Sequence, residues 1–128
     1  MQKIVLWVLA IVFLLIGVGF VLAPETFTEM ATETSPDGGA PLTEIRAVSG
    51  GVALGLGAFW ALCAQRAEWM AAGLVLGALV GAGLALGRVV GFVADGDVIG
   101  MQVGFAVAEV LTTVVCVLAL RADRSVQR

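Results

Sequence analysis

The stretch that decides the fold is IVLWVLAIVFLLIGVGFVLA, residues 4–23, a run of about twenty residues without a charge. A helix rises 1.5 Å per residue, so this run matches the roughly 30 Å hydrocarbon core of a bilayer. Further apolar stretches follow at about residues 42–64, 69–94 and 98–120, and none of them alternates like a barrel strand. The sequence therefore predicts an all-α polytopic membrane protein, a four-transmembrane-helix bundle in a single domain, residues 1–128, with one sizeable loop at 24–41.

The first span has a rival interpretation as a secretory signal peptide. Lys3 precedes the apolar run, and Val21, Leu22 and Ala23 resemble a small-residue cleavage site. The run is, however, longer than the roughly 7–15 apolar residues of a signal core. We therefore expect it to stay in the protein as the first helix.

Composition excludes several classes of protein and site. Only 13% of the 128 residues are charged, against roughly 25% in soluble domains, and 60% are hydrophobic. Histidine and tyrosine are absent, and the two cysteines without histidine make a poor metal site. We expect no metal, no cofactor and, with a net charge of −3, no nucleic-acid partner.

The basic residues predict an orientation in the membrane. The first loop and the third, residues 95–97, contain aspartate and glutamate but no lysine or arginine. The basic residues that lie near the chain ends and in the second loop are Lys3, Arg66, Arg121, Arg124 and Arg128. By the positive-inside rule, both termini are predicted to lie in the cytoplasm. In the first loop, the capping-box spacing of Thr26 and Glu29 suggests a short interfacial helix.

Glycines repeat at intervals of four along the predicted spans. Small residues let membrane helices approach closely, so such spacing is typical of helix contacts. The glycines expected to pack helices together are Gly51, Gly55, Gly77, Gly81, Gly83, Gly87, Gly91, Gly100 and Gly104. The third span carries two sets on roughly opposite faces, which predicts contacts on two sides. The same faces could bind a second copy or another membrane protein.

A few polar residues lie where the bilayer should be. Arg46, Arg88 and Gln102 fall roughly 6–8 Å below the outer surface, Glu109 about 16 Å, and Glu44 near the mouth. A charge at a helix centre costs about 2.5–3.5 kcal/mol on insertion scales, so these groups should face partners or water. We expect one buried cluster. It is either an ion-pair network that fixes helix register or a binding site for a small anionic or lipophilic ligand.

These residues also carry a resemblance to a known family. LTEIRA at 42–47, the glycine pair at 50–51, LGR at 86–88 and Glu109 resemble the small bacterial four-span proteins of domain-of-unknown-function family 4345. The likeness covers nearly the whole chain, and the layout is more weakly similar to DoxX-like proteins. Ser49 stands where an aromatic residue is expected. The resemblance implies a multi-pass protein of the bacterial inner membrane with a polar cluster of Glu44, Arg46, Arg88 and Glu109, and it implies no activity.

Three functions remain open on these residues. The first is a non-enzymatic bundle that binds or helps to move a small amphiphile or anion at the arginine and glutamate cluster. The second is an accessory or scaffold subunit that assembles through its glycine-rich faces. The third is a membrane isomerase or cyclase with Glu109 as acid, for which a second acid or base is missing. An enzyme is the less favoured class.

Overall fold

The computed structural model describes residues 1–96 and 98–126, with side chains as far as residue 122. The described residues form helices and no strand. The elements are α1 (Gln2–Leu22), α2 (Pro24–Thr32), α3 (Gly39–Ile45), a π-helical turn (Arg46–Gly51), α4 (Val52–Gln65), a 3₁₀ turn (Ala67–Trp69), α5 (Met70–Asp95) and α6 (Gly100–Val126). Four segments of this part of the chain are long and apolar enough to span a membrane: Gln2–Leu22, Gly39–Gln65, Ala67–Asp95 and Gly100–Ala122. This confirms the all-α, four-span prediction.

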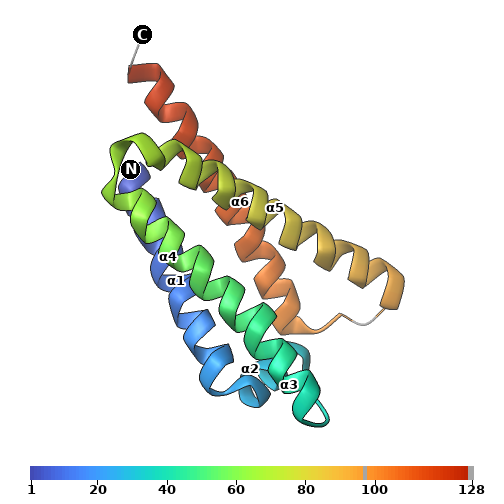
Figure 1. The fold of residues 1–128 in the computed structure, drawn as a ribbon. Helices are drawn as coiled ribbons and strands as arrows, with labels where there is room; N and C mark the ends of the chain where they lie inside the picture. The colour runs from blue at the N-terminus through green and yellow to red at the C-terminus, as the bar shows by residue number, and fades with distance from the viewer. Residues whose placement is uncertain (97, 127–128) are drawn as a thin grey trace.

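The helices form two pairs, α1 with α4 and α5 with α6 (Figure 1). The pairs meet at the end of the bundle that holds both termini, here called the closed end. The main cluster of buried hydrophobic residues lies there, and Ala53 at the start of α4 is buried outside it; the cluster consists of Leu6, Leu9, Ala10, Trp60, Cys63, Ala64, Leu74, Cys116 and Ala119. Tight packing of these side chains fixes the pairs against each other at one end only.

Trp60 is the largest side chain of this core and is completely buried. Its indole Nε1–H donates a hydrogen bond of 2.9 Å to the backbone carbonyl of Gly73 at the start of α5. The ring of Phe13 in α1 meets it edge to face, with centroids 4.7 Å apart. One residue of α4 therefore connects three helices, and satisfies its own polar group in doing so.

At the opposite end, here called the open end, α5 separates from the other helices. Figure 1 shows α5 running away from α2 and α3, while the start of α6 stays near them. The ring of Phe27 in α2 packs against Phe20 of α1 at 5.5 Å and lies over Gly19. The expected short helix in the first loop is thus present as α2, but it begins with Pro24 at its first turn rather than at the Thr26 capping box.

The second spanning segment contains a π-helical turn between α3 and α4. Gly50 lets this turn lie close against α1, because a Cβ on it would be only 2.7 Å from Val21 Cγ2 and 3.1 Å from the Val21 backbone nitrogen. A π turn adds a residue to the helical repeat and so rotates the residues before it relative to α4. The rotation affects Glu44 and Arg46, which precede or begin the turn.

Candidate functional site

An ion pair joins α5 to α6 within the membrane-spanning part of the bundle. Arg88 donates from Nε to both carboxylate oxygens of Glu109, at 2.9 Å to Oε1 and 3.0 Å to Oε2. The side chains keep 27% and 12% of their surface exposed, so the pair is shielded on most sides. Each charge compensates the other, which makes both tolerable at this depth.

The guanidinium of Arg88 is held by a second contact on α6. Its Cζ lies 5.0 Å from the ring centroid of Phe105, one turn from Glu109, in cation–π geometry. In the part of the chain that the structure describes, neither terminal nitrogen of Arg88 donates a hydrogen bond. The group is therefore fixed in position while part of its hydrogen-bonding capacity stays unused.

The α5–α6 groove opens beside this arginine, where the two helices diverge. Its volume is about 540 Å³. It is lined by Gly83, Leu84, Gly87, Arg88, Gly91, Asp95, Ile99 and Gln102. A Cβ on Gly83 or Gly87 would meet no atom within 4 Å, and one on Gly91 only Asp95 Oδ2 at 3.7 Å. The second glycine set of α5 therefore widens a groove in the single chain and contacts no other helix there.

The first glycine set of α5 lies in a different environment. A Cβ on Gly77 would be 2.9 Å from both Cys116 Sγ and Leu9 Cδ1. A Cβ on Gly81 would be 2.6 Å from Thr113 Oγ1 and 2.9 Å from the Glu109 backbone oxygen. At these positions the absence of a side chain brings α5 directly onto α6 and α1.

The remaining glycines also divide into those that face open space and those that lie at a close helix contact. A Cβ on Gly51 would approach only the Arg46 carbonyl oxygen, at 3.8 Å, and Gly55, Gly100 and Gly104 face open space. The closest α1–α4 approach lies instead at Gly17 and Gly57, where a Cβ would be 2.8 Å from Leu54 N and 2.9 Å from Leu14 N. Sequence reasoning missed both, because neither belongs to a run of glycines four residues apart.

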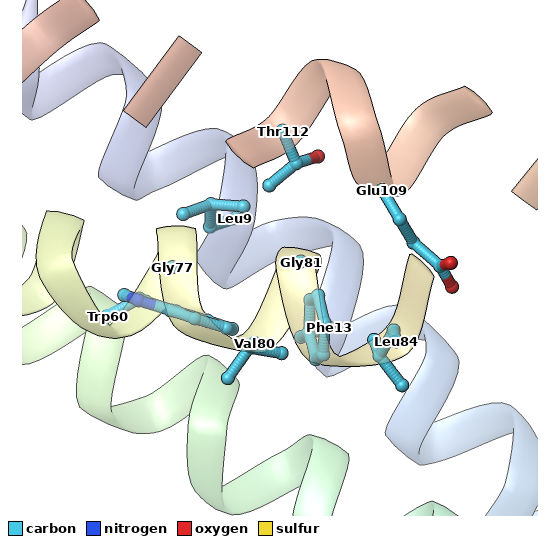
Figure 2. A pocket seen from close by; sticks show the side chains of 9 residues that line it. All are labelled: Leu9, Phe13, Trp60, Gly77, Val80, Gly81, Leu84, Glu109 and Thr112. Atoms are coloured by element: carbon cyan, nitrogen blue, oxygen red, sulfur yellow. The ribbon is translucent and has the colours of Figure 1, made fainter. Parts of the chain in front are cut away.

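A second, much smaller pocket reaches Glu109 from the closed end (Figure 2). Its volume is about 40 Å³, which suits one or two water molecules. It is lined by Leu9, Phe13, Trp60, Gly77, Val80, Gly81, Leu84, Glu109 and Thr112. Figure 2 shows the Glu109 carboxylate at its edge, directed away from Leu9 and Trp60. The space is too small for the lipophilic substrate of an isomerase or cyclase.

The five residues expected in one polar cluster lie in two places. Arg88 and Glu109 meet directly, and Gln102 lines the same groove as Arg88. Arg46 donates instead from Nε to the Val21 carbonyl at 3.3 Å, in the last turn of α1, and is exposed. Glu44 is exposed and makes no hydrogen bond or ion pair among the described residues. The arginine of the second span thus satisfies a helix-end carbonyl.

One of three comparisons with known proteins gave a match. Residues 1–120 match the family model described as domain of unknown function (DUF4345), and the chain belongs to this family. Comparison with curated proteins and with solved structures gave no match. Together with the four spanning helices, the family match identifies a multi-pass integral membrane protein that lies in a lipid bilayer.

Proposed function

Starting from membership of a family of unknown function, we propose that this protein is a non-enzymatic bundle that binds a small amphiphile in the α5–α6 groove. The observation that carries the proposal is the state of Arg88 at the groove wall. Glu109 and Phe105 hold its guanidinium in place, and its terminal nitrogens have no hydrogen-bond partner among the described residues. A ligand with an oxygen acceptor in its polar part could accept hydrogen bonds from the terminal nitrogens of Arg88.

The local charges favour an amphiphile over a small free anion. Glu109 already balances Arg88, and Asp95 adds a negative charge to the groove wall. A free anion would therefore meet no net positive potential there. An amphiphile gains in addition from van der Waals contact between its apolar part and Gly83, Gly87 and Leu84.

Filling the groove is the direct test of this proposal. Gly87→Leu places a bulky side chain where a Cβ has open space, so the helix itself is not strained. Gly55→Leu is the matched control, since Gly55 also faces open space but lies on α4, outside the groove. Native mass spectrometry of the detergent-purified full-length chain would count phospholipid molecules retained from the expression membrane.

We expect the wild-type chain and Gly55→Leu to retain lipid, and Gly87→Leu to lose most of it. Arg88→Gln should weaken retention as well, with Arg88→Lys restoring part of it because it keeps the charge. Equal retention by the wild-type chain and Gly87→Leu would overturn the proposal. A circular dichroism melt on each variant separates loss of lipid from loss of fold.

A second candidate function, assembly as an accessory or scaffold subunit, is supported by the open glycines of α6. Gly100 and Gly104 lie one turn apart with no atom near their Cβ positions, the spacing by which membrane helices of two chains can approach. Gly104→Leu should then shift the protein towards monomer in native mass spectrometry. A wild-type chain that is already a uniform monomer without a co-purifying protein would rule this assembly out.

We also propose that the protein resides in a bacterial inner membrane with both termini in the cytoplasm. The support is the distribution of basic residues and the family resemblance. In this orientation the closed end lies in the cytoplasmic half of the bilayer. The open end, with α2 and the groove, faces the outer half.

A further inference from the structure

We infer that the amphiphile of the α5–α6 groove is a glycerophospholipid with an ammonium head group; this inference rests on the proposed function and specifies its ligand. The observation behind it is the pair of opposite charges on one wall of the groove. Arg88 and Asp95 both line the groove from α5, two helical turns apart, with Gly91 between them. The two do not form an ion pair with each other.

Asp95 is directed along the groove and is uncompensated. Its Oδ2 lies 3.7 Å from the point where a Cβ on Gly91 would be, so the side chain folds back towards Arg88 over the bare glycine. It is the last residue of α5, at the negative end of the helix dipole, and the last turn holds no basic residue. Among the described residues it forms no salt bridge. A cationic group of a ligand would compensate the negative charge of this carboxylate.

The polar groups follow one another in the order of a phospholipid head group. The Asp95 carboxylate lies at the open end of α5 and the Arg88 guanidinium further inward, and the Gln102 amide lines the same groove from the first turn of α6. Seven residues of helix separate Asp95 from Arg88, which is about 10 Å along the axis. An ammonium at Asp95, a phosphate near the amide donor of Gln102 and an ester carbonyl at Arg88 would match this succession.

The groove wall on the closed-end side of Arg88 is apolar and suits the acyl chains of a phospholipid. Gly83 and Gly87 leave the surface of α5 bare, and Leu84 lies beside them. An acyl chain can lie against such a surface without displacing a side chain. A phospholipid without an ammonium, such as phosphatidylglycerol, would occupy the same wall but would place an uncharged glycerol beside Asp95 and leave its carboxylate unneutralised.

The experiment compares two lipids that differ only in the head group. The full-length protein is stripped of lipid in detergent and titrated with phosphatidylethanolamine or phosphatidylglycerol of identical acyl chains, with bound lipid counted by native mass spectrometry. We expect the wild-type chain to prefer phosphatidylethanolamine by roughly twofold to fivefold, the range of a partly exposed ion pair. Asp95→Asn should abolish this preference, whereas the control Glu29→Gln, an exposed acid on α2, should keep it.

The outcomes separate the two levels of the proposal. Equal binding of both lipids by the wild-type chain, or an unchanged preference in Asp95→Asn, overturns the ammonium assignment. If both lipids still bind less to Gly87→Leu, the groove itself remains the binding site. If neither lipid responds to Gly87→Leu, the proposed function fails together with this inference. Asp95 is exposed at a helix end, so its amide variant should melt like the wild-type chain.

Discussion

Adding one methyl group to Gly81 should weaken the α5–α6 contact beneath the ion pair. In Gly81→Ala the new Cβ would lie 2.6 Å from Thr113 Oγ1 and 2.9 Å from the Glu109 backbone oxygen, where ordinary contacts are 3.4–4 Å. The Thr113 hydroxyl cannot simply turn aside without loss, because it donates to that same carbonyl at 2.9 Å. The backbone of α6 must therefore move by several tenths of an ångström.

The expected magnitude follows from this geometry. Overpacking of a close contact costs about 1–3 kcal/mol, and we expect Gly81→Ala to lower the free energy of unfolding by that amount. Gly83→Ala, two residues along the same helix, meets nothing within 4 Å and should change it by no more than about 0.5 kcal/mol, with alanine's better helix propensity in its favour. The pair of variants thus isolates the contact from the chemistry of the substitution.

Reversible unfolding in mixed micelles, followed by circular dichroism as the denaturing detergent fraction increases, measures both variants against the wild-type chain. A smaller detergent fraction at the midpoint for Gly81→Ala alone is the expected result. Two outcomes would refute the reasoning: a Gly81→Ala protein as stable as the wild-type chain, or equal destabilisation by Gly83→Ala.

Three more predictions follow from the ion pair, the core and the charge distribution. A double-mutant cycle on Arg88→Gln and Glu109→Gln should give a coupling free energy of about 1–3 kcal/mol in the same unfolding assay, and additive single effects would contradict a direct pair. Trp60→Phe should lower the free energy of unfolding by about 1–3 kcal/mol, because it loses a hydrogen bond and leaves a space in the core. Trp7→Phe, at an exposed position, should lower it by no more than about 0.5 kcal/mol. Similar losses for both variants would argue against the core described above. A reporter enzyme active only in the cytoplasm and fused after Arg128 should be active, and an inactive fusion with an active extracytoplasmic counterpart would reverse the predicted orientation.

The number and length of the spanning helices could be predicted because they depend on composition along the chain alone. An uncharged apolar run such as residues 4–23 is stable inside a bilayer, and there its backbone must form a helix to satisfy its own hydrogen bonds. The polar residues at membrane depth could be recognised for the same reason. The expectation that arginines and Glu109 belong to one buried cluster needed only their levels along the helices, and Arg88 does pair with Glu109.

What could not be predicted is the rotation and tilt of each helix relative to its neighbours. Gly77 and Gly87 have the same spacing pattern, yet one lies against Cys116 and the other faces a groove, because they lie on different faces of α5 and only one of these faces meets another helix. Periodicity identifies a face and says nothing about what lies opposite. Arg46 shows the same limit: its level suggested the common polar cluster, but its side chain donates to the Val21 carbonyl of α1 instead.

The location of the core at the closed end has a consequence for the surrounding membrane. A bundle that is tight at one end and spread at the other has a wedge-shaped outline, and it occupies more area in one leaflet than in the opposite one (Figure 1). Lateral pressure and curvature then act on the angle between α5 and α6, since closing that angle reduces the area that the protein occupies in one leaflet. A lipid seated between α5 and α6 would support the wide side of the wedge, so the thickness and tension of the bilayer would bear directly on how far the two helices stand apart.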